Sequence, residues 1–583
     1  MMNYKIFKIY KLLNKTEKVK FNLLIFFTVI TFFIEYVSLI SLPILAGFIS
    51  ENYELINKIS KYFFVNIGEV KNDSNLVLYV AIFTVSVFFF KNIFIIILNI
   101  YQFKFFKNLK VQFGLKLFSN YINEPYLNQI SRNPSEIVRD VADELDNFLS
   151  YYSNLFIMLR EILAIISIFL LLIFINFYII LSVILFLGLV SFIYFKNVKP
   201  LIKNKSKDNQ IFRSKIIQHL NETNGLIKEI KILGLENNFT NFFRNIKNLY
   251  EKNLLLFEIV QRLPKNFLEI IVISYLVILS FIFMIILDDK NFLFTLLPIL
   301  LVSFLRFIPA FNGISTIITY LKIYKPSVEL IFKKIDSNLE IFNKNIDERK
   351  TEKTLKLNLN INNFQNYIYL DNLSFIYPKN KKIVFKNLST QIKKGSRFGI
   401  VGASGSGKTT LFNIMLGLLK PSQGNVFFKD ISIFKNLKIW RQKIGYVSQN
   451  IYLLDTSIKN NITLNINGNE NVNHDQLEKA IQIANLSQKV NSLPEGLETK
   501  VGNDGVNLSG GEKQRIALAR AIYCNPEIFF LDEPTSALDD KTENIIMSNL
   551  INKYKDKTII SIAHRKSTID RCDTVFDLNK FKV

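Results

Sequence analysis

Cysteine is nearly absent from this chain: Cys524 and Cys572 are the only two among 583 residues, and both lie in the C-terminal part. No disulfide framework is therefore implied, and the composition suits a reducing compartment. Acidic residues are also in short supply, because 48 Asp and Glu face 72 Lys and Arg, giving a formal net charge of +24. Such a basic excess is typical of a nucleic-acid partner or of a membrane surface.

The placement of the basic residues favours the membrane. Six lysines stand just before the first apolar run: Lys5, Lys8, Lys11, Lys15, Lys18 and Lys20. An excess of Lys and Arg at the ends of membrane spans marks the cytoplasmic side. We therefore expect no nucleic-acid partner and an N-terminus on the cytoplasmic side.

Polar interruptions are rare in several long stretches of the N-terminal half. A spanning helix needs about 20 mostly apolar residues. Six stretches meet this requirement: 22–49, 76–100, 156–176, 178–195, 267–287 and 292–323. The segment 51–66 is too short and too polar to span, and its spacing of apolar residues predicts an interfacial amphipathic helix, with an ordinary polar loop as the alternative.

Two long polar segments, 101–155 and 196–263, are too long to be simple turns. We interpret them as extensions of the spanning helices into the cytoplasm. Each has an internal break, at 123–136 and at 221–234, which predicts a hairpin tip carrying a short helix that docks on a soluble domain. A kinked helix without a partner is the alternative.

The domain organisation follows from this change in composition. We expect a membrane domain over residues 1–334, a polar linker over 335–366 and a soluble domain over 367–583. In the soluble part, strand-like runs alternate with helical ones: IYLDNLSFIY, RFGIV, NVFFKD, KIGYV, IFFLD and TIISIA. This alternation predicts an α/β domain with a largely parallel sheet.

A Gly-rich segment, GASGSGKTT, fits the pattern of a phosphate-binding loop. It follows a short apolar run and opens a helical one, which is the strand–loop–helix context that this chemistry requires. Backbone N–H groups and the helix N-terminus would surround the phosphates of ATP. Lys408 would reach the β- and γ-phosphates, and Thr409 would hold Mg²⁺. The predicted nucleotide-binding residues are Gly402, Ala403, Ser404, Gly405, Ser406, Gly407, Lys408, Thr409 and Thr410.

An acidic pair closes the apolar run IFFLDE. Asp532 would support Mg²⁺, directly or through water, and Glu533 would polarise the water that attacks ATP. The order and distance of this pair after the Gly-rich loop are what make it informative.

At this point the soluble domain resembles the ATPase domain of ABC transporters. NLSGGEKQRIALARA resembles the family's signature, and the other family motifs follow in order. The resemblance implies that Tyr377 stacks on adenine, that Gln449 contributes to catalysis and to the metal site, and that His564 lies beside the γ-phosphate. It also assigns nucleotide contacts to Ser509, Gly510, Gly511 and Asp539. Glu512 departs from the more usual glutamine.

The same resemblance implies the fold class and the assembly. The fold is expected to be an all-α six-helix transmembrane domain of the type IV ABC exporter kind, fused to a P-loop α/β nucleotide-binding domain. The chain has one Gly-rich loop and one signature, and in this family the signature of one copy closes over the ATP of another. We therefore expect a homodimer with two-fold symmetry, and a heterodimer with a related half-transporter is the alternative.

Four charged residues stand inside or at the ends of the predicted spans: Glu35, Lys91, Lys265 and Arg306. Such residues are costly in a membrane and are usually functional. Three cations and one acid favour a cavity for an anionic group such as a phosphate. In the alternative, Glu35 pairs with one cation as a structural ion pair, and Lys265 extends to a membrane surface.

At the level of the whole chain, the sequence is similar to the bacterial flippases of lipid-linked oligosaccharides. The similarity includes FFIEYVSLISLPI (32–44), RFIPAFN (306–312) and RQKIGYVSQNIYLLDTSI (441–458). It implies outward movement of a polyprenyl-pyrophosphate-linked glycan across the bacterial inner membrane, with the ATPase domain in the cytoplasm. Export of peptides, drugs or other lipids is the close alternative, and a channel-gating or ligand-sensing ABC protein is a more distant one.

Overall fold

The computed structural model describes residues 9–49, 74–130, 132, 134–175, 177–282, 284, 290–352, 367–378, 382–465, 472–502, 506, 508–535, 537–563 and 565–581. The chain divides into two compact units. Unit 1 comprises Met1–Glu124 and Arg132–Lys344, and unit 2 comprises Pro125–Ser131 and Asn345–Val583.

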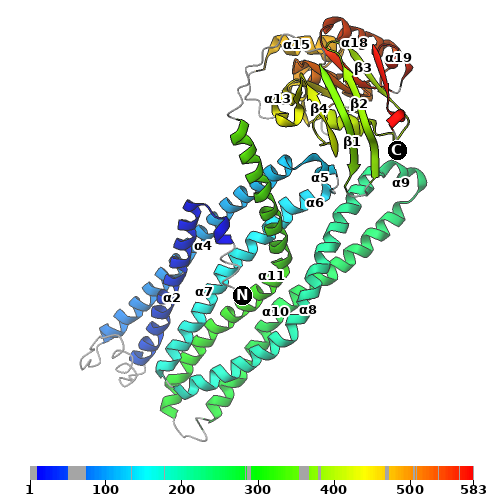
Figure 1. The fold of residues 1–583 in the computed structure, drawn as a ribbon. Coiled ribbons are helices and arrows are strands. Elements are labelled where there is room, and N and C mark those ends of the chain that lie inside the picture. The colour runs from blue at the N-terminus through cyan, green and yellow to red at the C-terminus, as the bar shows by residue number, and fades with distance from the viewer. Residues whose placement is uncertain are drawn as a thin grey trace. The chain divides into compact units, whose positions relative to one another are not determined.

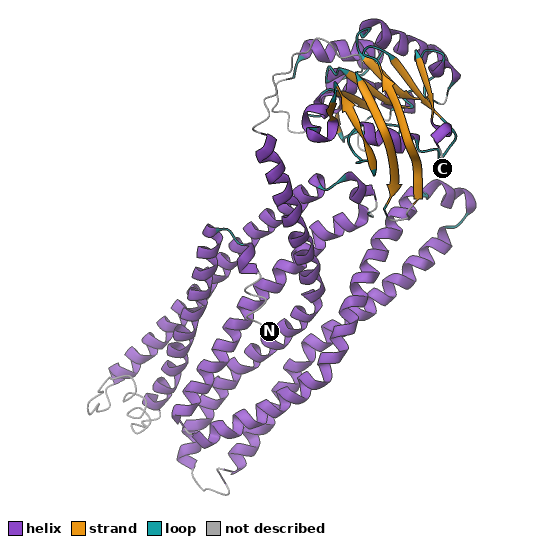
Figure 2. Cartoon of the chain, in the orientation of Figure 1, coloured by secondary structure: helices purple, strands orange, loops and turns teal. Residues whose placement is uncertain are grey.

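Unit 1 is built from long helices (Figure 1). Their bounds are α2 (Lys15–Ile49), α4 (Ser74–Asn123), α6 (Pro134–Arg139), α7 (Leu145–Ile175), α8 (Phe177–Gly225), α9 (Ile227–Leu233), α10 (Glu236–Phe281) and α11 (Lys290–Glu352), with a π-helical turn (Asp140–Glu144) before α7. A helix satisfies its own backbone N–H and C=O groups, which is what an apolar segment needs in lipid. In Figure 2 the described secondary structure of these segments is helical.

Five helices in the described part of the chain are long and apolar enough to cross a membrane. They cover Lys15–Ile49, Val77–Asn123, Glu136–Ile173, Glu236–Phe281 and Ile299–Ile335, in agreement with five of the six predicted spans. The remaining predicted span, 178–195, lies within α8. The predicted amphipathic helix at 51–66 lies outside the described residues.

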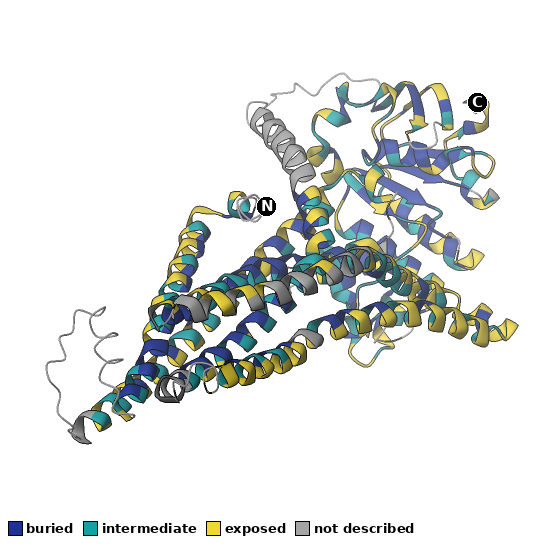
Figure 3. Ribbon diagram, turned by 90° about the horizontal axis from the view of Figure 1, so that it is seen from below, coloured by how far each residue is buried: buried dark blue, intermediate teal, exposed yellow. Residues whose placement is uncertain are grey.

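Two apolar clusters hold the membrane helices together. One is aromatic and joins α2, α4, α7 and α11; in it Phe148 contacts Phe332 edge-on at 5.4 Å between ring centroids. The other is mostly aliphatic and joins α2, α7, α10 and α11 through residues such as Leu39, Ile168 and Leu300. Many apolar side chains of α4 and α10 stay exposed in the chain, as expected for surfaces that face lipid. Figure 3 shows exposed residues, in yellow, along the long helices.

Both predicted hairpin tips contain the expected short helix. The first is α5 (Tyr126–Ile130), which belongs to unit 2, where Tyr126 and Leu127 pack against the core of the sheet domain. The second is α9 in unit 1, which ends at Gly234 in the left-handed conformation and exposes Ile232 and Leu233.

The remainder of unit 2 is an α/β domain whose strands are orange in Figure 2. Within the described residues, a parallel five-stranded sheet has the order β11-β3-β10-β9-β6, and an antiparallel sheet has the order β2-β1-β4-β5. The strands of the parallel sheet are β3 (Arg397–Val401), β6 (Ile444–Val447), β9 (Ile528–Asp532), β10 (Thr558–Ile562) and β11 (Thr574–Asp577). Those of the antiparallel sheet are β1 (Ile368–Tyr377), β2 (Lys382–Ile392), β4 (Gln423–Phe428) and β5 (Ile431–Ser432).

Shorter elements complete unit 2. The strands β7 (Thr456–Ser457) and β8 (Lys500–Val501) form a small antiparallel pair. The helices are α12 (Lys408–Met415), α13 (Leu437–Gln442), α14 (Ile458–Thr463), α15 (His474–Ile483), α16 (Ser487–Asn491), α17 (Gly510–Tyr523), α18 (Asp540–Lys553) and α19 (Lys566–Ile569).

The six strand-like runs predicted from the sequence all form strands, and the largely parallel sheet is confirmed. Strands β2 and β11, and the two-residue strands β5, β7 and β8, were not predicted. Helix α11 continues to Glu352, well into the segment expected as a linker, and residues 353–366 lie outside the described part.

Candidate functional site

The register of the parallel sheet gathers the predicted site segments at one edge. Ile562 of β10 pairs with Ile400 of β3 on one side and with Asp532 of β9 on the other. Val447 of β6 pairs with Leu531. The loops after these strands therefore leave the sheet side by side at its carboxyl edge, which is where ligands bind in such sheets.

The Gly-rich loop connects β3 to the N-terminus of α12. Its last glycine, Gly407, has a φ of 98°, in the region that favours glycine. A Cβ atom at this position would lie 2.4 Å from Cγ1 of Val384 on β2. The loop therefore owes its tight approach to β2 to the missing side chain.

Lys408 turns its side chain back over this loop. Its ammonium donates hydrogen bonds to the carbonyl oxygens of Gly402 and Ala403, at 2.7 and 3.0 Å. Burial lowers the pKa of Lys408, and the carboxylates of Glu533 and Asp532 oppose that shift. The ammonium and the two carboxylates are thus close enough to interact, as the phosphate-binding role requires.

Tyr377 ends β1 beside the same loop. Its hydroxyl lies 3.1 Å from the hydroxyl of Thr410, in the first turn of α12, and its ring contacts Phe375 edge-on. Thr409 is exposed, whereas Thr410 is buried. This places an aromatic face next to the phosphate-binding loop, where the sequence predicts adenine stacking.

The acidic pair follows β9. Asp532 is the last residue of the strand and is buried. Glu533 has a φ of 49°, an unusual conformation for a residue with a long side chain. Local backbone strain of this kind concentrates at functional sites. The turn it makes redirects the chain at the carboxyl edge of the sheet.

Gln449 is exposed, two residues beyond the end of β6. Three residues before it, Tyr446 is 41% exposed, and burial of the rest of its side chain together with Asp532 and Tyr126 raises its pKa to about 12. Tyr126 of α5 is therefore close to the strand that leads to Gln449. His564 lies outside the described residues; the residue before it, Ala563, donates its N–H to the carbonyl of Ile400.

The residues present fit a magnesium ion that is held largely by nucleotide phosphates. Among the described residues, no group of three or more His, Cys, Asp or Glu side chains could cage a metal ion. Mg²⁺ usually keeps few protein ligands and binds through one or two carboxylates together with phosphates. Thr409, Asp532 and Gln449 would supply the protein side of such a site.

The signature segment begins α17 with a capping box. The Ser509 hydroxyl accepts the N–H of Glu512 at 3.2 Å, and the Glu512 carboxylate accepts the N–H of Ser509 at 2.8 Å. Burial opposes ionisation of Glu512, but the ion pair with Lys489 and the Ser509 N–H together lower its pKa. The departure from glutamine therefore has a structural role: the carboxylate closes the cap and pairs with Lys489.

The two signature glycines, Gly510 and Gly511, pack against the segment SALD. A Cβ atom on Gly511 would lie 2.9 Å from Leu538, and the N–H of Ala537 donates to the side chain of Gln514 on α17. Asp539 caps α18 by accepting the N–H of Thr542 at 3.0 Å. Ser536 lies outside the described residues.

A buried carboxylate that the sequence did not point to ties this segment to the one after His564. Glu543 of α18 is 1% exposed and accepts hydrogen bonds from Arg565 at 2.8 Å and from the hydroxyls of Ser567 and Thr568 at 3.2 Å. Arg565 also donates to the carbonyl of Leu538 at 3.2 Å. The network links SALD, α18 and the chain beside His564.

Unit 1 contains a second candidate site, a buried cluster of charges. Glu35 of α2 accepts a hydrogen bond from Arg306 of α11 at 2.5 Å and lies 3.6 Å from the ammonium of Lys91 on α4. The cluster does not include Lys265, whose side chain is exposed on α10. Two of the three predicted cations are therefore brought together, and both share the acid.

Two members of this cluster were missed from the sequence. Glu161 of α7 lies 3.9 Å from both Arg306 and Arg160, and Arg160 donates to the side-chain oxygen of Asn99 at 2.6 Å. Both residues stand inside the predicted span 156–176, so their position within an apolar run was the available signal. Among the described residues, the cluster therefore holds three cations and two acids.

The matches to known proteins cover different parts of the chain. Residues 385–536 match the family model described as ABC transporter. Unit 2 thus carries an ABC-type ATP-binding domain, the domain that hydrolyses ATP in ABC exporters. A solved structure of a bacterial Atm1-family ABC exporter with ATP bound is similar to the chain with a TM-score of 0.74 and 18% sequence identity, covering 95% of this chain and 93% of that one. This likeness establishes the exporter fold: a helical membrane region joined to a nucleotide-binding domain.

Curated relatives match over a shorter length. ABC transporter B family member 13 of Arabidopsis thaliana is 40% identical over 255 residues, which is 43% of this chain and 19% of that protein. The multidrug resistance-like ATP-binding protein MdlA of Buchnera aphidicola is 40% identical over 244 residues, 40% of this chain and 39% of that protein. An ATP-dependent lipid A-core flippase of Shewanella denitrificans is 39% identical over 221 residues, 38% of this chain and 36% of that protein. The matches therefore span well under half the length of these relatives.

Proposed function

We propose that this chain is one half of an ATP-driven exporter that moves an amphipathic, anionic, lipid-linked substrate from the inner to the outer leaflet. A lipid-linked oligosaccharide is the substrate that we favour, in the bacterial inner membrane. One observation carries the proposal. The same chain contains apolar membrane helices, which enclose an excess of positive charge, and an ABC-type ATP-binding domain.

The residues at the carboxyl edge of the sheet have separate roles in ATP hydrolysis. Lys408 and the N–H groups of the Gly-rich loop bind the phosphates, and Tyr377 stacks on the base. Glu533 accepts the proton of the attacking water, and His564 and Gln449 position the γ-phosphate and that water. Thr409, Asp532 and Gln449 would hold Mg²⁺, which would supply positive charge to the phosphates of ATP.

The complete site needs a second copy of the chain. Ser509 and Gly510 are exposed at the start of α17, as a surface that closes over a partner's nucleotide must be. Because one chain supplies one Gly-rich loop and one signature, a two-fold homodimer would contain two complete ATP sites. Asp539, beside the signature glycines, would then lie at the dimer interface.

Coupling to the membrane helices is supported by α5. This helix packs with Tyr126 and Leu127 against the core of the sheet domain, and Tyr126 lies close to Tyr446, three residues before Gln449. Its chain continues directly from α4, which carries Lys91. A change at Gln449 on nucleotide binding therefore has a short path to a membrane helix.

The substrate assignment depends on the charge cluster. The three cations of the cluster face two acids, Glu35 and Glu161, which leaves one net positive charge, and the side chain of Arg306 is 28% exposed. A phosphate or pyrophosphate on a lipid would be attracted to this excess of positive charge. Export of a peptide, drug or other lipid is the alternative.

Reconstituted protein tests the two halves separately. Glu533→Gln is expected to retain ATP binding and to lose nearly all turnover; turnover at the original rate would refute the role of that carboxylate. A lipid-linked glycan is expected to stimulate the ATPase of the unaltered chain in proteoliposomes, whereas a cationic drug is not. Arg306→Ala should reduce transport while basal ATPase stays largely intact. Equal loss of both would point to a folding role for Arg306.

A further inference from the structure

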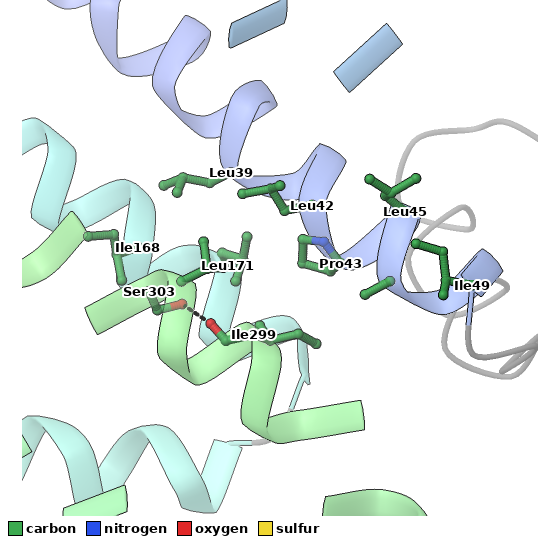
Figure 4. A pocket seen from close by; sticks show the side chains of 11 residues that line it. Leu39, Leu42, Pro43, Leu45, Ile49, Ile168, Leu171, Ile299 and Ser303 are labelled. Carbon is green, nitrogen blue, oxygen red and sulfur yellow. Dashed lines mark hydrogen bonds between the residues drawn. The ribbon is translucent and has the colours of Figure 1, made fainter. Parts of the chain in front are cut away.

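An apolar pocket lies among the same helices that carry the charge cluster. It has a volume of about 220 Å³ and is lined from α2, α7 and α11 by residues that include Leu39, Pro43, Ile168, Leu171 and Ile299 (Figure 4). Among the described lining residues, Ser303 alone has a polar side chain, and its hydroxyl donates to the carbonyl of Ile299 at 2.7 Å. The wall therefore suits hydrocarbon and offers no polar partner to a hydrophilic ligand.

The pocket and the charge cluster share three helix faces. Leu39 follows Glu35 by four residues on α2, and Ser303 precedes Arg306 by three on α11. Residues spaced by three or four lie on one face of a helix, about 4.5–6 Å apart along its axis. On α7, Ile168 follows Glu161 by two turns, again on one face.

The direction from charge to hydrocarbon is the same on all three helices. Increasing residue number on α2 and α7, and decreasing number on α11, leads from the cluster to the pocket. Ile49, the last residue of α2, lines the pocket and is exposed. The two features therefore form one continuous lining, polar at one end and apolar at the other, about 5–10 Å apart along the helices.

We propose that the cluster and the pocket together form one binding site for an amphiphile, in which the cluster holds a phosphate group and the pocket holds the first carbons of the attached hydrocarbon chain. The charge complementarity of Lys91 and Arg306 selects an anion at the polar end. The lining of the pocket selects a chain that is attached next to that anion. The inference rests on the proposed function and deepens it, because it specifies where the lipid part of the substrate lies.

Packing, and not water exclusion, supplies the selectivity of this pocket. Lipid tails are as apolar as the side chains of a membrane helix, so moving a chain from the bilayer into the pocket gains little hydrophobic free energy. The phosphate must therefore anchor the ligand, and the pocket then accepts the chain. Loss of the anchor is expected to empty the pocket of this ligand.

The experiment uses the full chain in proteoliposomes and two photoreactive probes. One is an alkyl phosphate with a diazirine on one of the first carbons of its chain, and the other has the same chain, the same diazirine and a neutral hydroxyl. Labelled residues are identified by mass spectrometry. The phosphate probe is expected to label Leu171 and Ile299 saturably, in competition with unlabelled alkyl phosphate but not with alkyl alcohol. Arg306→Gln, which removes charge-assisted hydrogen bonds, should reduce this labelling about tenfold.

A matched pair of variants tests the pocket itself. Ser303→Leu adds bulk inside the pocket and should reduce labelling there several-fold. Ser274→Leu is the control, because Ser274 on α10 also donates to the carbonyl four residues back, at 2.8 Å, but is exposed away from the pocket. Leu39→Phe fills the pocket from α2 and repeats the test if Ser303→Leu does not fold.

Equal labelling of the pocket by both probes, or phosphate-probe labelling confined to lipid-facing residues such as Phe89 and Ile96, would overturn the inference. The failures of the two proposals differ. If the ATPase responds to lipid-linked anions while labelling lies elsewhere, the amphiphile site is wrong and the transport function stands. If the pocket is labelled saturably while ATPase and transport do not respond, the site stands and the transport function is wrong.

Discussion

Replacing the buried carboxylate of Glu543 by an amide should damage the ATP site from a distance. Glu543→Gln keeps an acceptor for Ser567 and Thr568 but presents an amide where Arg565 now finds a negative charge. A hydrogen bond to a charged group contributes about 1.5–3 kcal/mol. Breaking a fully buried ion pair costs about 3–5 kcal/mol. Because the Arg565 side chain is 38% exposed, water screens part of the interaction, and we expect a loss of about 2 kcal/mol.

This loss has both a thermal and a kinetic consequence. For a unit of this size, it corresponds to a fall of about 4–8 °C in the midpoint of thermal unfolding. The network also fixes the chain that directly follows His564, where a displacement of about 1 Å can cost about a hundredfold in rate. ATP turnover should therefore fall by at least about tenfold, while ATP affinity, which depends on the Gly-rich loop, should change little.

Thermal unfolding, nucleotide binding and ATPase rate are measured on the full chain. Asp540→Asn is the matched control, because Asp540 starts the same helix and lies 3.8 Å from the same arginine, but its side chain is 93% exposed. That variant should stay within about 0.5 kcal/mol of the unaltered protein. If Glu543→Gln behaves like Asp540→Asn in both unfolding and turnover, the network does not hold the site together.

Two further predictions concern the edges of the sheet domain. The hydrogen bonds from Arg397 lower the pKa of Asp573, so this pair stabilises the fold above about pH 4, the unfolded value, and loses its effect as pH falls through the lowered folded value. Asp573→Asn should therefore lower the unfolding midpoint of the full chain at neutral pH, and the difference from the unaltered protein should vanish in acid; a difference that persists in acid would contradict the assignment. Tyr126→Ala, at the surface of α5 that packs on the sheet domain, should preserve basal ATPase and weaken its stimulation by substrate, and unchanged stimulation would exclude coupling through α5.

The features predicted from the sequence are those that depend on local pattern. The runs that became β3, β9 and β10 are apolar and short, and the Gly-rich loop carries its own conformational requirement at Gly407. The features that were missed depend on tertiary contacts. Arg160 and Glu161 belong to the charge cluster because the fold brings them close to Arg306, nearly 150 residues later in the chain. No spacing rule in the sequence connects these positions.

The same reasoning explains why Lys265 lies outside the cluster. A lysine at the start of an apolar run predicts a buried charge only if its helix turns that side towards the bundle, and α10 leaves Lys265 exposed. Glu543 is the opposite case, a charged residue that is buried although nothing in the sequence indicated it. It stands in an ordinary amphipathic helix, and its burial follows from the return of the chain at Arg565.

The strand order of the parallel sheet also constrains when the chain becomes active during its synthesis. Strand β3, which leads into the Gly-rich loop, has β10 and β11 as its two neighbours, and both are made much later: Gly395 before β3 bonds to Thr558 of β10, 163 residues further on. A ribosome that has just completed the loop has therefore made neither flanking strand. Because a parallel sheet forms only when its distant strands meet, ATP binding must wait until nearly the whole chain has been translated. By that point the apolar helices at the other end of the chain have long since emerged, so membrane insertion precedes nucleotide use.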